Sequence, residues 1–149
     1  MMDREIDVVL AYWNEQRQQF RQSENQRATM TNFILVIISA LSGLIIQQKF
    51  ADTTIPLGAL IITLGVYGAL ISAKYHERAI FHRRKAKALT MTLKDLGALH
   101  DNPHLEAATA RHHSLHRRLS HVRLHWFWTG LHIAVAIHGA TLIIIAIIR

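Results

Sequence analysis

Histidine is the residue type whose number and spacing in this chain most suggest chemistry. Seven of the eleven histidines lie between residues 100 and 125. His112 and His116, like His121 and His125, are four residues apart, a spacing that places both imidazoles on one helix face, where they can chelate a divalent metal. No Asp, Glu or Cys lies between residues 107 and 149 to complete a ligand set. We therefore interpret these side chains as solvated histidines that gain charge on acidification, and we expect no metal or cofactor.

Two further histidines, His132 and His138, lie inside the most apolar stretch of the chain. A polar side chain in a membrane span needs a partner, so both are expected to contact other helices. Because they are six residues apart they point to different faces and cannot form one site by themselves. Haem ligation between helices is the alternative, and bound haem would be detected by its absorbance.

Polar residues at heptad-like spacing mark the first apolar stretch. These residues are Asn25, Asn32, Ser39 and Gln47. Steps of seven or eight residues keep their side chains near one helix face. Exposure of that face to lipid would be costly, which predicts either interhelical hydrogen bonding or the lining of a pore.

Small residues recur at four-residue spacing in all three apolar stretches, a pattern that lets helix backbones approach closely in lipid. For oligomer packing we select Gly43, Gly65, Gly68, Ala69, Ser72, Gly130 and Ala134. The spacing does not distinguish packing between subunits from packing within one chain.

Clusters of basic residues lie outside the apolar stretches. They are Arg83, Arg84, Lys85, Lys87, Arg117 and Arg118. Such clusters contact anionic lipid headgroups, or alternatively an anionic ligand such as a nucleotide messenger. Nucleic acid is disfavoured because no aromatic residues for base stacking accompany the cluster.

The sequence offers no constellation typical of an enzyme. It has no cysteine, and none of its ten carboxylates lies in an apolar stretch. A phosphate-binding glycine loop, a nucleophile motif and a metalloprotease motif are also absent from the sequence. We therefore predict a protein that is not an enzyme.

Three stretches without Asp, Glu, Lys or Arg must position these residues: 28–46, 55–73 and 126–148. Each approaches the roughly 20 residues needed to cross a membrane as a helix, which predicts spans over about 28–48, 55–73 and 126–148. Residues 74–125 hold eleven Lys and Arg against four Asp and Glu. The excess of positive charge places this segment and the N-terminus in the cytoplasm, and the C-terminus outside the plasma membrane.

Turn signals at 49–54 and 101–103 divide the chain into three predicted helices, 3–48, 55–100 and 103–148. The fold class expected is therefore an all-α integral membrane protein of one domain, with helices running up, down and up. Residues 1–27 and 74–125 would form a cytoplasmic stalk. Within the stalk, apolar residues of the second and third helices repeat in steps of three and four, which predicts a packed hairpin between these two helices.

Two segments bordering the first two spans carry a family resemblance. They are 24–32 (ENQRATMTN), which leads into the first span, and 74–86 (KYHERAIFHRRKA), which follows the second. With the short loop between the spans, residues 10–96 resemble the SLATT group of bacterial membrane proteins. The resemblance implies a pore-forming effector of anti-phage defence that acts with a nucleotide-messenger sensor. The third span has no counterpart in that two-span layout.

The function expected from these features is a homo-oligomeric membrane channel or pore-forming effector, gated through the basic stalk. The alternative is a membrane-anchored scaffold whose stalk docks a soluble cytoplasmic partner. Besides another copy of the chain, membrane lipids are the partners expected.

Overall fold

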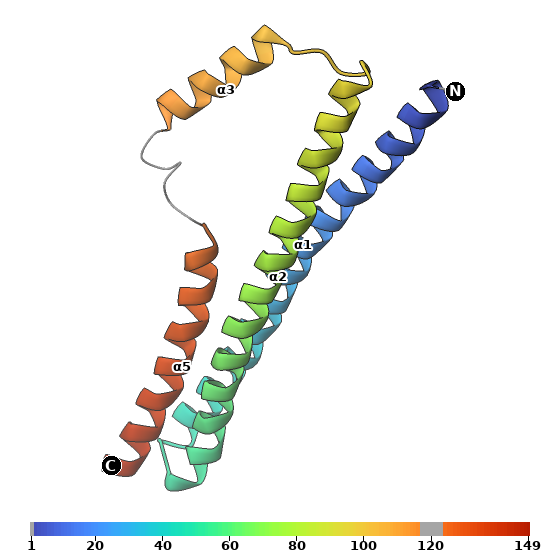
Figure 1. The fold of residues 1–149 in the computed structure, drawn as a ribbon. Helices are drawn as coiled ribbons and strands as arrows, with labels where there is room; N and C mark the ends of the chain where they lie inside the picture. The colour runs from blue at the N-terminus through green and yellow to red at the C-terminus, as the bar shows by residue number, and fades with distance from the viewer. Residues whose placement is uncertain (1, 117–123) are drawn as a thin grey trace. The chain divides into compact units, whose positions relative to one another are not determined.

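The computed structural model describes residues 2–116 and 124–149, and all of its regular structure is helical. The elements, in chain order, are α1 (Met2–Gln47), the 3-10 turn η1 (Asp52–Thr54), α2 (Ile55–Asp95), α3 (Pro103–Leu115) and α5 (Leu124–Ile148). Figure 1 shows them along the chain. Among the described residues, α1, α2 and α5 are long and apolar enough to cross a membrane. The chain is an all-α integral membrane protein, as the sequence predicts.

The helices form two compact units. We call Met1–Gln22 with Arg78–Leu124 the stalk unit, and Ser23–Glu77 with His125–Arg149 the membrane unit. Both α1 and α2 contribute to each unit. The membrane unit contains the three apolar stretches and also the charged residues that border them, Glu24, Arg27, Lys74 and Glu77.

A tight turn joins α1 to α2 within the membrane unit. The Lys49 amide donates to Ile46 and the Phe50 amide donates to Ile45, which is the hydrogen-bond pattern of a Schellman motif. Lys49 and Phe50 both adopt positive φ, and Phe50 packs against the apolar core. The Thr54 hydroxyl donates to the Ala51 carbonyl at 2.7 Å inside η1.

The end of α2 and the start of α3 have clear local causes. Gly97 has φ +71°, and the amides of Gly97 and Ala98 donate back to Lys94 and Leu93. This second Schellman motif ends the helix at Asp95, five residues before the predicted end at residue 100. Asn102 Oδ1 then accepts from the His104 amide at 3.0 Å and caps the helix that begins at Pro103, within the turn predicted at 101–103.

The predicted apolar face of α2 is buried in the stalk unit, but its partner is α1. Ala79, Ala86 and Leu93 are buried. Trp13 Nε1 of α1 donates to Thr90 Oγ1 at 2.9 Å, and His82 Nδ1 lies 2.8 Å from Gln16 Oε1. The predicted hairpin of the second and third helices is therefore wrong at the described residues, and α3 is exposed along its length wherever burial is described.

The third predicted helix, 103–148, is described as α3 and α5, on either side of residues 117–123. The predicted positions Arg117 and Arg118 lie outside the described residues, as does His121. The side chain of Leu105 also lies outside the part of the chain that the structure describes. The span 126–148 is contained in α5.

Three helices pack around one core in the membrane unit. The buried apolar residues are Ile34, Ile38, Ile45, Ile61, Val135 and Leu142. Antiparallel packing of α2 on α5 depends on glycine, because a Cβ at Gly65 would lie 2.6 Å from the Ala136 backbone nitrogen and one at Gly58 would lie 2.5 Å from Ile143.

Gly65, Gly68 and Ser72 are buried within the chain, between its own helices. At Gly65 and Gly68 packing within the chain takes the place of the expected packing between subunits, because Ala136 and His132 of α5 lie beside them. Ser72 is buried within the chain as well. Gly43 and Gly130 differ, since a Cβ there would meet nothing within 4 Å. Ala69 is half-buried and Ala134 exposed. Oligomer packing stays a prediction for these four positions.

Candidate functional site

The polar residues predicted on α1 all lie on the outside of the membrane unit. Asn25, Asn32, Ser39 and Gln47 are exposed. The buried residues Arg27, Thr31, Ile34, Ile38 and Ile45 alternate with them along the helix. At 100° per residue the two sets occupy opposite sides of α1. We call the set Asn25, Asn32, Ser39 and Gln47 the outer face of α1, and it is not covered by the chain's own helices.

The Ser39 hydroxyl donates to the Leu35 carbonyl at 2.8 Å. That bond satisfies a hydroxyl donor inside an apolar environment without any help from a second helix. For the amide of Asn32, no hydrogen bond is found among the described residues. Its amide has two donor hydrogens and an acceptor oxygen, so this position makes the outer face costly to leave in lipid.

The two histidines of α5 both have hydroxyl partners on α1, which confirms that they contact another helix. Thr31 Oγ1 and His132 Nε2 share a hydrogen bond of 3.1 Å, and Ser42 Oγ and His138 Nε2 share one of 3.0 Å. His132 is 1% exposed, whereas His138 lies on the surface of the unit. His132 is therefore the histidine enclosed by the three helices.

An arginine is buried one helical turn away from Thr31. Arg27 is 4% exposed, its Nη2 lies 2.5 Å from Glu24 Oε2, and its guanidinium carbon lies 5.1 Å from the Trp128 ring centroid. Its Nε and Nη1 groups are buried and have no hydrogen-bond partner among the described residues. A buried charge normally has all its donors paired, so this arginine is under-satisfied by its own protein.

The register between α2 and α5 places Ser72 on the same level as Trp128, whose ring contacts Arg27. In the contacting pairs Gly58/Ile143, Gly65/Ala136, Gly68/His132 and His76/His125 the two residue numbers add up to 200 or 201. Ser72 and Trp128 fit the same register. Ser72 is 3% exposed, and its Oγ has no partner among the described residues.

Two stacked histidines, one on α2 and one on α5, form the next level beyond Ser72 and Trp128. The rings of His76 and His125 lie 4.1 Å apart between centroids with an interplanar angle of 9°. Both residues are outside the predicted spans. Burial is the main reason that the pKa of His76 is lowered; the positive charges of His125 and Arg27 lower it further, and Glu24 acts in the opposite direction. These surroundings favour the uncharged form of the His76 ring.

Together these side chains form three polar levels inside the membrane unit, each built from all three helices. We call them the polar core: Glu24, Arg27, Thr31, Gly68, Ser72, His76, His125, Trp128 and His132. Successive levels are about four residues apart on every helix. The core begins at the end of the membrane unit where Ser23 and Glu77 lie, which we call the stalk end, and beyond His132 the interior is apolar.

Comparison with protein-family models, with curated proteins and with solved structures finds no match. The polar core and the outer face of α1 must therefore be interpreted from their own chemistry.

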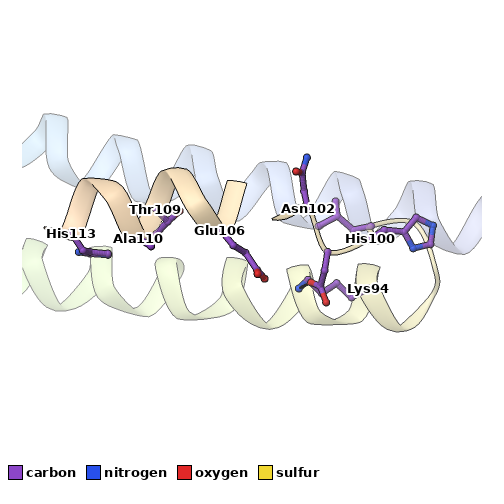
Figure 2. Close-up of a pocket in the computed structure, with 9 residues that line it drawn as sticks. Lys94, His100, Asn102, Glu106, Thr109, Ala110 and His113 are labelled. Carbon is purple, nitrogen blue, oxygen red and sulfur yellow. Dashed lines mark hydrogen bonds and ion pairs between the residues drawn. The ribbon is translucent and has the colours of Figure 1, made fainter. Parts of the chain in front are cut away.

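The stalk unit offers a more open candidate. Arg83, Arg84, Lys85 and Lys87 are exposed, with Lys85 Nζ 4.5 Å from the Phe81 ring centroid. A pocket of 450 Å³ lies where the end of α2 meets α3, and Figure 2 shows its lining. Lys94 and Asp101 form an ion pair there, and His100, Glu106 and His113 border the same space.

The histidine-rich segment does not assemble a metal site in the described part of the chain. The rings of His112 and His116 are tilted, with centroids 4.9 Å apart, and both residues are exposed. No group of three His, Cys, Asp or Glu residues suited to a metal occurs among the described residues.

Sequence reasoning expected a partner helix for His132, but it assigned Gly68 and Ser72 to oligomer packing and His125 to solvated histidines. The other members of the polar core were not predicted as site residues. A usable signal existed: Arg27 borders the first apolar stretch, and positions 27 and 31, 68 and 72, and 128 and 132 share four-residue spacing. Register between helices was needed to show that these pairs lie together, and a single sequence does not give that register.

Proposed function

We propose that the protein is a homo-oligomeric membrane channel or pore-forming effector, with the outer face of α1 lining or bordering its path. The observation that carries this proposal is the exposure of Asn32 on a helix long and apolar enough to cross a membrane. An exposed amide in hydrocarbon leaves several hydrogen-bonding groups unsatisfied, at a cost of a few kcal/mol. Water or a second copy of the chain would remove that cost.

A second copy of this chain is the natural occupant of the outer face. Gly43 lies on the same side of α1 and is open to close approach by another helix. One three-helix unit with an interior filled by Ile34, Ile38 and Val135 has no room for an ion path of its own across the membrane. Several copies arranged around the outer faces of their α1 helices could enclose one.

Orientation and trigger belong to the same proposal. The excess of positive charge in residues 74–125 favours a cytoplasmic stalk, and the exposed Arg83, Arg84, Lys85 and Lys87 are available to anionic lipid or to an anionic messenger. The SLATT-like layout of residues 10–96 suggests that opening serves anti-phage defence by dissipating the membrane gradient.

Single-channel recording in planar bilayers tests the proposal. Wild-type protein is expected to give discrete openings in the presence of a cytoplasmic signal, and Asn32→Leu is expected to change unitary conductance or abolish openings. Thr63→Leu is the matched control, because Thr63 is an exposed span residue on α2 whose hydroxyl bonds its own helix. Absence of conductance across a range of pH and nucleotide ligands would contradict the proposal.

A scaffold function is the second candidate, and the exposed α3 helix favours it. Its described side chains are all exposed, and it carries Arg111, His112 and His113 without covering α2. Under this alternative a soluble anionic protein would bind the stalk unit. Co-purification of a stoichiometric soluble partner, with normal activity after Asn32→Leu, would favour the scaffold over the channel.

A further inference from the structure

We propose that the polar core is a hydrated proton-access path from the stalk end of the membrane unit, and that His132 is the proton-binding site at its inner end. This inference concerns the interior of a single chain. It does not depend on the oligomeric channel proposed above.

The unpaired groups of the core require hydrogen-bonding partners. Arg27 Nε, Arg27 Nη1, Ser72 Oγ and His132 Nδ1 are all buried and have no partner among the described residues. Leaving a buried donor or acceptor unpaired costs about 1–3 kcal/mol for each group. These groups lie on two neighbouring levels of one core, so a short chain of water molecules could satisfy them together.

The order of the groups along the polar core suits the passage of a proton toward His132. The stacked rings of His76 and His125 stand at the stalk end, Ser72 and Arg27 follow, and His132 with Thr31 forms the last level. Imidazoles and hydroxyls both donate and accept hydrogen bonds, so protons can pass along them through water. The Arg27 charge is balanced by Glu24 and repels other cations that enter the same space.

Beyond His132 the core is closed. Ile34, Ile38, Ile61 and Val135 belong to one buried apolar cluster, and Ile61 is 0% exposed. A proton that reaches His132 therefore stays there or returns by the way it came. This closure makes His132 a site of proton binding and not a point along a continuous wire across the chain.

The binding step changes few bonds. With Nε2–H donating to Thr31 Oγ1, the Nδ1 lone pair accepts a proton from a neighbouring hydronium and leaves water behind. The other charged or titratable groups of the polar core are Glu24 and Arg27 from α1, His76 from α2 and His125 from α5. The positive charge of Arg27 opposes a second positive charge in the same core, and the Glu24 carboxylate offsets it.

Nitrogen NMR on the full chain in lipid nanodiscs gives the direct test. With ¹⁵N-labelled histidine, the His132 ring is assigned as the signal lost in His132→Gln, a change that keeps a hydrogen bond to Thr31. The ring nitrogens are expected to shift from neutral to charged values as the pH is lowered from about 8 to about 4, a range that extends well below the ordinary histidine pKa of about 6.5. A His132 signal that stays neutral over this range, while exposed histidines titrate normally, would overturn the proposal.

Cysteine accessibility tests the path itself, since the chain has no cysteine of its own. Ser72→Cys and Ile61→Cys are matched, because both residues are at most 3% exposed and both lie on α2. A small charged thiol reagent is expected to modify Ser72→Cys at least about tenfold faster, because thiolate formation needs water at the site. Equal rates in correctly folded protein, judged by unchanged elution and helicity, would show that no water reaches the core.

Discussion

Arg27 is the residue on which the interior of the membrane unit depends most. It combines an ion pair with Glu24, a contact with the Trp128 ring and burial at 4% exposure. Arg27→Gln is expected to destabilise the protein by about 2 kcal/mol, since a charged hydrogen bond and a desolvated cation–π contact are lost together. Thermal unfolding in detergent, followed by tryptophan fluorescence, measures this change.

Arg21→Gln is the control for that variant, because Arg21 is exposed on the same helix. Its effect should stay within about 0.5 kcal/mol, as is usual at the surface. If the two variants were equally stable, the buried contacts of Arg27 would contribute nothing measurable.

Protonation at the stalk end links stability to pH. The pKa of His76 is lowered by burial first, and then by the charges of His125 and Arg27. The unfolded chain therefore takes up a proton at His76 near the ordinary pKa of about 6.5, before the folded chain does. Stability is expected to be highest above about pH 6.5 and to fall as pH decreases toward the folded pKa.

Replacing the titrating group should flatten this pH profile. His76→Asn is expected to lose part of the decrease in unfolding temperature on acidification, and the remainder includes His82, whose pKa is lowered by burial and then by Arg78 and Lys85. If the unfolding temperature of His76→Asn fell with pH as steeply as that of the wild type, His76 would not contribute to the pH dependence of stability.

At the scale of helices, the sequence predicts which faces are buried better than it predicts their partners. The stepped apolar residues of α2, such as Ala79, Ala86 and Leu93, are buried as expected, but α1 covers them. Periodicity reports a buried face and carries no information about which helix lies on it. The polar contacts of Trp13 and Gln16, which specify α1 as the partner, have no periodic signal.

Helix ends have local causes in the sequence, whereas contacts between helices have distant ones. Asn102 and Pro103 act within one turn and were predictable, and Gly97 was a local signal that the extended apolar pattern concealed. The polar core required the register of three helices, as its Ser72 and His132 levels show. The outer face of α1 was predicted as a polar face, whereas its exposure depends on where the other two helices pack.

Two glycines distinguish packing within the chain from packing between chains. A Cβ at Gly65 would lie 2.6 Å from the Ala136 backbone, which cannot move aside easily, so Gly65→Ala is expected to cost about 1–3 kcal/mol in the free energy of unfolding. Gly43→Ala meets nothing within 4 Å in the same chain and should leave that free energy nearly unchanged. Thermal unfolding of both variants in detergent makes the comparison.

Gly43→Leu extends the comparison to assembly. If the outer face of α1 contacts another copy, a bulky side chain there should reduce the oligomer mass measured by native mass spectrometry. The unfolding temperature of the single chain should stay unchanged. An unchanged mass would place the contact between copies on another face.

At the scale of the whole molecule, we expect the asymmetry of charge to determine on which side of the membrane the stalk lies. Segment 74–125 carries eleven Lys and Arg, whereas the turn between α1 and α2 carries Lys49 and Asp52, one charge of each sign. Juxtamembrane Lys and Arg are retained on the cytoplasmic side during insertion, so the exposed basic residues of α2 should control orientation.

Reporter fusions turn this charge argument into a measurement. Alkaline phosphatase joined after Arg149 is expected to be active, because that enzyme matures outside the cytoplasm, whereas green fluorescent protein at the same position should stay dark. Replacing Arg83, Arg84, Lys85 and Lys87 by Gln removes four of the eleven charges and should lower the phosphatase signal. The inverse pattern in the wild type would reverse the orientation and place the stalk end of the polar core outside the cell, so that His132 would take its protons from the external medium.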